Sequence, residues 1–284
     1  MSQEPRSGPI AVLKFGGEVV ADAPALAGVL AEVTSLTRSG WRFALCHGGG
    51  PQANALQAEL GLKPIKVGGR RVTDIATLRV MKQVLAGQVS VDVVAAASAV
   101  GLDAVGISGV SAGLVTARRR PPKIVSGGGP KPVDFGLVGD VLRIRRGLVL
   151  HLWAGGYTPV INTLGIGEAE PPGPCPVFNI NADTVASALA ASLGADHLFL
   201  MTGVPGVLRD KDDPSTRIPR LGATTARQAI ADGTIVGGMI PKVEEALENL
   251  ALGIRAVHIV GSEPGTLTAE AKSPGARGTV VCSS

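Results

Sequence analysis

The chain has 284 residues, 45% of them hydrophobic, with a formal net charge of +4, so it is long and apolar enough for one large α/β domain or two closely packed lobes. It contains no apolar run of about 18 residues typical of a membrane span, and its N-terminus lacks the apolar stretch of a signal peptide. The basic clusters at 118–120 and 143–146 lack interleaved aromatic residues, which argues against nucleic-acid binding.

Short apolar runs alternate with helical patterns along the chain, as in βαβ units that build a mostly parallel sheet. Asp74 is placed to cap a long Ala/Val-rich helix, and residues 63–72 read as a β-hairpin. The predicted strands are residues 10–13, 43–46, 104–107, 137–144, 158–162, 197–201 and 256–260, and the predicted helices are residues 26–36, 52–60, 74–100, 183–193 and 241–252.

Two stretches rich in Pro and Gly interrupt this pattern. Residues 118–136 predict an irregular surface excursion, and residues 165–176 predict a boundary between two lobes. We place the division after residue 170, which gives lobes at 1–170 and 171–284.

Glycine-rich turns follow the first two predicted strands, namely Gly16-Gly17 and Gly48 to Gly50. Ligands of an open parallel sheet bind beyond the carboxyl ends of its strands. Glycine lets the backbone approach a phosphate closely, and successive N–H groups form an anion-binding nest. The sequence therefore predicts that the two turns hold one polyanionic ligand, although each turn alone is also compatible with a purely structural role.

Two lysines set near glycine indicate the chemistry. Lys14 lies at the end of the first strand, and Lys242 lies in the first turn of a helix, where a cation gains nothing from the helix dipole. Phosphoryl transfer needs mainly alignment and cations around the moving group. We therefore predict a phosphoryl-transfer site in which Asp183 holds both lysines in position, while Asn181 caps the following helix.

Three other features allow fewer conclusions. Arg71, on the hairpin, fits a surface charge and a fork for a substrate carboxylate equally well. His47 is interpreted as a hydrogen-bonded structural histidine and not as a base. The three cysteines, Cys46, Cys175 and Cys282, lack metal-ligand spacing, so we expect free thiols in a reducing, cytoplasmic compartment and no protein metal site.

Six segments occur in a family-specific order: Lys14-Phe15-Gly16-Gly17, His47-Gly48-Gly49-Gly50-Pro51-Gln52, Arg71-Val72-Thr73, Asn179-Ile180-Asn181-Ala182-Asp183, Val204-Pro205-Gly206-Val207 and Gly238-Met239-Ile240-Pro241-Lys242-Val243. Together they resemble the N-acetylglutamate kinases of the amino acid kinase family over nearly the whole chain. The resemblance implies ATP- and Mg²⁺-dependent phosphorylation of the side-chain carboxylate of N-acetyl-L-glutamate, giving N-acetyl-L-glutamyl 5-phosphate in arginine biosynthesis. It also implies an α/β fold, a three-layer αβα sandwich with a mostly parallel central sheet.

The resemblance also implies roles for individual residues. Lys14 and Lys242 would stabilise the transferring phosphoryl group, with Asp183 organising them, and Arg71 would take the α-carboxylate of the amino acid. The lobe at 1–170 would bind the amino acid and dimerise, and that at 171–284 would bind the nucleotide. The implied amino-acid-binding residues are Gly49, Gly50, Arg71 and Asn179, and the implied phosphate- and ATP-binding residues are Gly16, Gly17, Gly203, Val204, Pro205, Gly206, Val207, Leu208, Thr234, Ile235 and Val236.

The chain departs from the family pattern at three places. Gly203 stands where the family commonly has Asp, so we expect altered metal handling or ATP affinity. The excursion at 118–136 lies outside the pattern, and roles in substrate closure and in oligomer contacts both stay open. Arginine-inhibited hexameric members carry an extra N-terminal helix, whereas nine residues precede the first strand here. We therefore expect a homodimer without strong arginine feedback.

Other functions compete with this interpretation. An aminoadipate-type or carbamate-type acceptor is the nearest alternative within the kinases. A non-catalytic nucleotide-binding regulator is favoured only by Gly203. An esterase is indicated by Gly109-Val110-Ser111-Ala112-Gly113, with Ser111 as nucleophile, and by the upstream His-Gly-Gly-Gly. A nucleophile elbow needs a helix directly after its serine, and residues 114–122 do not predict one.

Overall fold

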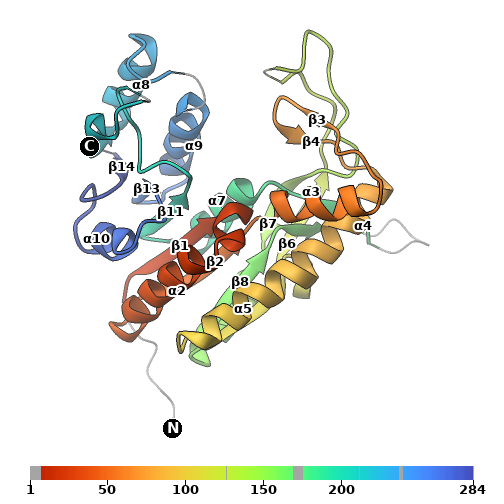
Figure 1. Ribbon diagram of the computed structural model, residues 1–284, viewed down its shortest axis with the longest axis horizontal. Helices are drawn as coiled ribbons and strands as arrows, with labels where there is room; N and C mark the ends of the chain where they lie inside the picture. Colours follow the sequence, from red (N-terminus) through yellow and green to blue (C-terminus); the bar gives the residue numbers. More distant parts are fainter. Residues whose placement is uncertain (1–7, 126, 169–174, 211, 237–238, 284) are drawn as a thin grey trace.

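The computed structural model describes residues 8–125, 127–168, 175–210, 212–236 and 239–283 (Figure 1). Its larger sheet has eight strands, and neighbouring strands are parallel except β13 and β14. Across the sheet the order is β12 (Arg220–Gly222), β14 (Thr279–Cys282), β13 (Ala256–Val260), β11 (His197–Met201), β1 (Ile10–Phe15), β2 (Arg42–His47), β8 (Thr158–Asn162) and β5 (Ala104–Ser108).

Helices cover both faces of this sheet because its central strands are apolar on both sides. Along β1, Ala11 and Leu13 pack on one face and Val12 on the other, and all three are fully buried. The predicted three-layer αβα sandwich is therefore confirmed. The first face carries α1 (Gly17–Ala21), α2 (Ala23–Arg38), α3 (Gly50–Glu59), α4 (Ile75–Lys82), the π-helical segment η1 (Gln83–Val89), α5 (Ser90–Ala99) and α10 (Thr266–Lys272), and the second carries α6 (Gly147–Ala154), α7 (Ala182–Leu193), α8 (Ala223–Ala231) and α9 (Met239–Ala251).

The long helix predicted after Asp74 is continuous from α4 through η1 to α5. As predicted, Asp74 caps it, because its Oδ1 accepts a hydrogen bond of 2.7 Å from the Thr77 backbone N–H. By length and composition alone this helix is apolar enough to cross a membrane. In the fold, α5 packs on α2 and β5, which accounts for its apolar side.

A smaller four-stranded sheet and a hairpin are formed by residues between 66 and 179. The prediction of an irregular excursion from residue 118 was wrong at its start, because Arg118 and Arg119 belong to a strand. The predicted division after residue 170 lies outside the described residues and stays a prediction. The smaller sheet has the order β10 (Val177–Asn179), β9 (Leu164–Ile166), β6 (Val115–Arg119) and β7 (Gly139–Ile144), the hairpin comprises β3 (Lys66–Val67) and β4 (Arg70–Arg71), and single 3₁₀ turns are η2 (Ser111–Gly113) and η3 (Pro214–Thr216).

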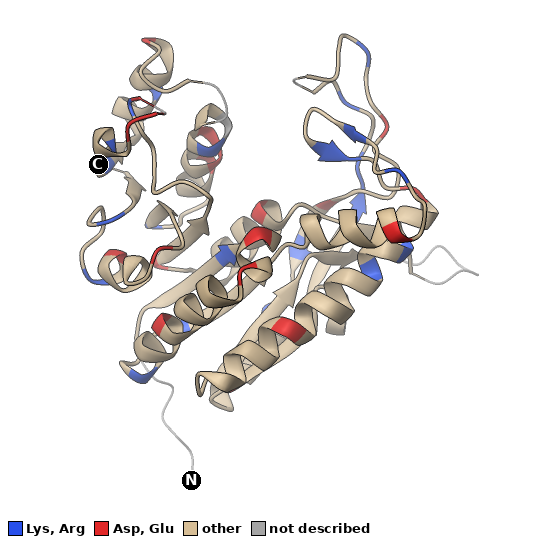
Figure 2. Cartoon of the chain, viewed as in Figure 1, with Lys and Arg blue, Asp and Glu red and all other residues tan. Residues whose placement is uncertain are grey.

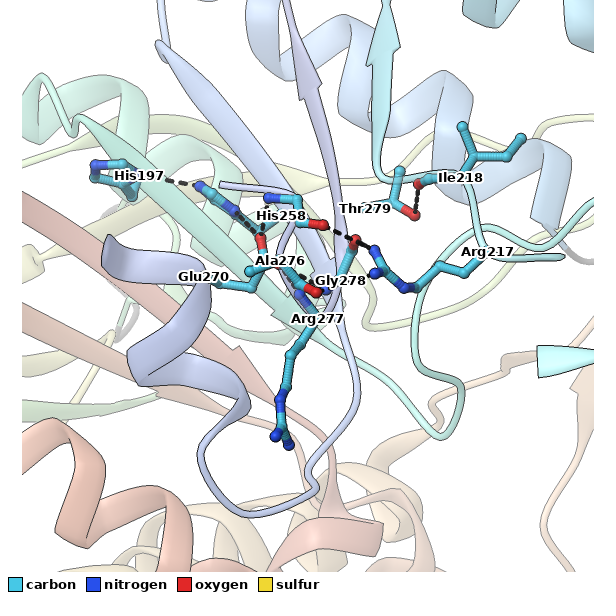
Figure 3. A network of polar contacts seen from close by, with 10 residues as sticks. His197, Arg217, Ile218, His258, Glu270, Ala276, Arg277, Gly278 and Thr279 are labelled. Carbon is cyan, nitrogen blue, oxygen red and sulfur yellow. Dashed lines mark hydrogen bonds and ion pairs between the residues drawn. The ribbon is translucent and has the colours of Figure 1, made fainter. Parts of the chain in front are cut away.

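A buried polar network ties α10 to β13 and to the loop before β14 (Figure 3). The Glu270 carboxylate lies 3.0 Å from His258 Nδ1, and His258 Nε2 lies 3.0 Å from His197 Nδ1. Burial raises the pKa of Glu270, but its hydrogen bonds outweigh burial and lower the pKa to about 2. Glu270 also accepts three backbone hydrogen bonds, from Gly275, Arg277 and Gly278.

Candidate active site

The structure brings the two predicted lysines together at the carboxyl ends of β1 and β11. Lys14 is the last residue but one of β1, Lys242 comes from the start of α9 and Asp183 from the first turn of α7, and all three line a cavity of about 140 Å³. Lys14 Nζ and Asp183 Oδ1 form an ion pair of 2.8 Å. Lys242 has no ion pair with another described residue, so its positive charge is available to a ligand.

Electrostatics distinguish the two lysines. Burial lowers the pKa of Lys242, the positive charge of Lys14 lowers it further, and the negative charge of Asp183 acts in the opposite direction. The prediction that Asp183 holds both lysines is therefore confirmed as a direct contact only for Lys14. A half-buried ammonium group without a partner costs folding free energy, which points to a functional reason for its position.

The two glycine turns lie side by side, as predicted. A Cβ added at Gly17 would lie 2.8 Å from Pro51 Cδ and 3.0 Å from Gly49 Cα, so only glycine permits this approach. Gln52 Nε2 donates a hydrogen bond of 2.7 Å to the Gly17 carbonyl, which fastens the first turn to α3. Gly16 lines the small cavity beside the lysines.

A second, larger cavity of about 600 Å³ contains all four residues that the resemblance assigns to the amino acid: Gly49, Gly50, Arg71 and Asn179. Arg71 donates hydrogen bonds to Asn54 Oδ1 at 2.6 Å, to the Gly50 carbonyl at 3.3 Å and to Gln57 Oε1. These acceptors are neutral, and burial lowers the pKa of Arg71 without removing its charge. Arg71 is thus held at the wall of a cavity without an ion pair to another described residue, which favours the substrate-binding interpretation over a solvated surface charge.

Neighbouring polar residues hold this wall in place. Asn179 Nδ2 donates to Thr73 Oγ1 at 3.1 Å, and Asn181 caps α7 by accepting a hydrogen bond from the Asp183 backbone N–H, as predicted. His47 is fully buried, its Nδ1 lies 3.1 Å from the Gly48 carbonyl, and burial lowers its pKa to about 4. The imidazole is therefore neutral and structural at pH 7, in agreement with the sequence interpretation.

Opposite charges face each other across the larger cavity. Figure 2 shows basic residues on the β3–β4 hairpin, and α9 carries acidic residues toward the same cavity. Of the charged residues that line this cavity, the sequence predicted a binding role only for Arg71. For Glu245 a signal existed, because it follows Lys242 by three positions and so shares its helix face. The charged residues lining this cavity are Arg70, Arg71, Arg120, Lys123, Glu244, Glu245 and Glu248.

The predicted nucleotide-binding residues at 203–208 and 234–236 line neither cavity. The side chains of Val207 and Ile235 are buried in the core, so only their backbone groups are available to a nucleotide. A Cβ added at Gly203 would meet no atom within 4 Å, and this glycine directly follows Thr202, which lines the small cavity. The roles of these two segments stay predictions.

The esterase alternative is contradicted by local structure. Strand β6, and not a helix, follows the turn that contains Ser111. The Ser111 hydroxyl accepts a hydrogen bond of 3.1 Å from the Ser108 backbone N–H, and the residue in the left-handed conformation is Ala112, with φ of 51°. His258, a histidine late in the chain, is buried against Glu270 in the network described above and is not available to Ser111.

Comparison with known proteins agrees with this geometry. Residues 9–261 match the sequence profile described as the amino acid kinase family. The acetylglutamate kinase of Sorangium cellulosum is 49% identical over 97% of this chain and 95% of its own length, and that of Anaeromyxobacter dehalogenans is 50% identical over 95% and 98%. The solved structure of Giardia carbamate kinase shares the fold, with a TM-score of 0.67 at 19% identity over 97% of this chain and 99% of its own. The chain belongs to the amino acid kinase family.

Proposed function

We propose that this protein transfers the γ-phosphoryl group of ATP to the side-chain carboxylate of N-acetyl-L-glutamate, giving N-acetyl-L-glutamyl 5-phosphate for arginine biosynthesis. The observation that carries the proposal is the pair of adjoining cavities. One holds Lys14, Lys242 and Asp183, and the other holds Arg71 and Asn179. The acetylglutamate kinases at 49% and 50% identity support the choice of acceptor.

The reaction joins the two cavities. An oxygen of the acceptor carboxylate attacks the γ-phosphorus, the bond to the oxygen that bridges the β- and γ-phosphates breaks, and ADP leaves with that oxygen. A glutamate-type carboxyl group has an unperturbed pKa of about 4.3, so the acceptor is ionised at pH 7 and requires no general base. The work left for the protein is alignment and neutralisation of charge.

Each site residue then has a separate task. Lys14, fixed at 2.8 Å from Asp183, and Lys242, without a partner among the described residues, supply two positive charges to the moving phosphoryl group. Arg71 presents a planar fork to the acceptor's α-carboxylate, which leaves the side-chain carboxylate to reach the small cavity. Gly16 and Gly17 allow the phosphates to approach the backbone closely.

ATP is the proposed phosphoryl donor, and magnesium is proposed to enter with it. The described residues contain no group of three or more His, Cys, Asp or Glu side chains arranged to hold a metal ion. This agrees with an ion carried mainly by phosphate oxygens and water, as Mg²⁺ commonly is in kinases. When bound, the ion neutralises charge on the transferring phosphates.

The proposal also covers the cellular compartment, the roles of the two lobes and the assembly of the enzyme. The three cysteines are free thiols, which fits the reducing, ATP-containing cytoplasm. The lobes at 1–170 and 171–284 are proposed to bind the amino acid and the nucleotide, respectively. A homodimer is the expected assembly, and light scattering of the purified protein measures it.

Trapping of the acyl phosphate with hydroxylamine tests the proposed function directly. The assay compares N-acetyl-L-glutamate with free glutamate, an aminoadipate derivative and bicarbonate with ammonia, in the presence of ATP and magnesium. We expect selective turnover of N-acetyl-L-glutamate. Turnover of another acceptor would reassign the substrate, and ATP binding without turnover of any acceptor would favour a regulatory protein.

A further inference from the structure

Glu245 occupies the junction of the two cavities. It lines the larger cavity with Arg71 and Asn179 and the small cavity with Lys14 and Lys242. It lies three residues after Lys242 on α9, so both side chains project from the same helix face. Its carboxyl group has no hydrogen bond or ion pair with another described residue. A carboxyl group without a partner thus stands where the acceptor carboxylate has to pass.

The charge balance of the small cavity depends on this carboxyl group. Among the described residues, two lysines line the cavity together with three acidic residues, Glu18, Asp183 and Glu245. With Glu245 ionised, acidic charges exceed the basic ones before any phosphate or carboxylate enters. With Glu245 protonated, the lysines balance Glu18 and Asp183. Two carboxylates in one poorly solvated site repel each other strongly.

The surroundings of Glu245 favour its neutral form. Burial raises its pKa to about 7, and the negative charge of Asp183 on α7 contributes to the rise. Lys14 on β1 acts in the opposite direction, and Glu248, one turn further along α9, raises the pKa again. The charged groups that face the cavities from other elements are Glu18 on α1, Arg70 and Arg71 on β4, Arg120 after β6 and Lys123 in the excursion, and α9 itself also carries Lys242 and Glu244.

We propose that Glu245 controls entry of the acceptor by its protonation state. The neutral carboxyl group admits the side-chain carboxylate of the acceptor to the phosphoryl cavity, and the ionised group repels it. Glu245 is thus a specificity-determining and positioning residue, which acts on the ground-state approach of the acceptor and not on the transferring phosphoryl group. The inference rests on the proposed function, because it requires an anionic acceptor.

The test is the pH dependence of kcat/KM for N-acetyl-L-glutamate between pH 5.5 and 9, at saturating ATP and magnesium. For the natural protein we expect a tenfold fall per pH unit above about pH 7. In Glu245→Gln this fall in kcat/KM should disappear. The difference between the two proteins should lie in KM and not in kcat. Glu244→Gln, which changes a neighbouring exposed carboxylate of α9 that lines only the larger cavity, should retain the fall.

A second measurement does not depend on activity. An acid whose pKa is raised on folding destabilises the folded state once the pH exceeds its unfolded value, and the penalty is complete above the folded pKa. The model value for Glu is 4.5 and the folded value about 7. Glu245→Gln should therefore raise the melting temperature relative to the natural protein more at pH 8 than at pH 5.

The outcomes separate this inference from the proposed function. A fall in kcat/KM that persists in Glu245→Gln, or a melting-temperature difference that does not depend on pH, would overturn the inference while leaving the kinase intact. A magnesium requirement that rises in Glu245→Gln would also overturn it, because that result assigns Glu245 to the metal. Glu245→Ala repeats the test if glutamine disturbs α9. Absence of turnover by the natural protein at every pH would refute the proposed function instead.

Discussion

Lys242 gives the sharpest prediction, because its contributions to function and to stability have opposite signs. Lys242→Met keeps the length and the apolar stem of the side chain and removes only the ammonium group. In the structure that group is half-buried and has no ion-pair partner among the described residues, and burial lowers its pKa. Removal of the charge therefore breaks no ion pair with a described residue, and the attraction to Asp183 and Glu18 that it also removes is smaller than the unfavourable effects of burial and of Lys14.

The expected magnitudes follow from this environment. Loss of one preorganised cationic donor to a transition state costs about 10²- to 10³-fold in kcat, or about 2.7–4 kcal/mol. The unfolding free energy should stay within about 0.5 kcal/mol of the natural value or rise, because a buried unpaired charge is replaced by an apolar group. Lys14→Met differs, because it leaves the Asp183 carboxylate without its partner at 2.8 Å and should reduce stability as well as turnover.

Two assays check the prediction, acyl-phosphate formation at saturating substrates and urea unfolding. Lys82→Met is the matched control, since Lys82 is an exposed lysine of α4 that lines neither cavity, and its kcat should be unchanged. A Lys242→Met protein with near-normal kcat, or one destabilised by several kcal/mol, would refute the assigned role.

Three further predictions concern other parts of the molecule. Arg71→Ala should raise the KM for the acceptor about 10- to 100-fold with little effect on kcat, because a charge-assisted contact is worth about 1.5–3 kcal/mol, and a kcat effect alone would contradict this. Gly203→Asp should fold normally, because its Cβ meets no atom within 4 Å, and should lower the magnesium or ATP requirement in steady-state titrations. Glu270→Gln should cost about 3–5 kcal/mol at pH 7 in urea unfolding. Because the folded pKa of Glu270 is about 2 against an ordinary 4.5, the natural protein should lose this advantage as the pH falls from about 4.5 to about 2, and an unchanged difference at pH 2.5 would be inconsistent with the network.

The sequence predicted those elements whose local signals are strong. Strands β8, β11 and β13 were predicted at their observed bounds, because each is an apolar run bounded by glycine or charged residues. The Asp74 and Asn181 caps were predicted because a capping side chain acts within three residues of its own position. Such interactions are local and therefore readable from sequence.

Other elements were missed because their stability comes from tertiary contacts. Strands β9, β10 and β12 have three residues each, too few to show a period, and β6 ends inside a stretch rich in arginine. Helices α6, α8 and α10 were also not predicted, although α10 supplies the buried Glu270. Short elements of this kind are fixed by pairing and packing with distant segments.

The candidate site was predictable only where its residues follow from local sequence signals. Strand ends and glycine turns placed Lys14 and Gly16 at one edge of the sheet, and the structure confirms that Lys242 and Asp183 join Lys14 there. The presence of two cavities, and the position of Glu245 between them, depends on how α9 packs against the rest of the fold. The sequence period indicates which side chains share one face of α9, but it does not indicate which other elements that face contacts.

The order of strands at one edge of the large sheet constrains how the chain is assembled during synthesis. Strand β12 enters the sheet only beside β14, although Thr279–Cys282 is translated well after Arg220–Gly222. When β12 and α8 have emerged from the ribosome, the strand with which β12 pairs has therefore not yet been synthesised. This part of the molecule has to wait for the last strand, and it is the region where we expect a chaperone to engage the nascent chain.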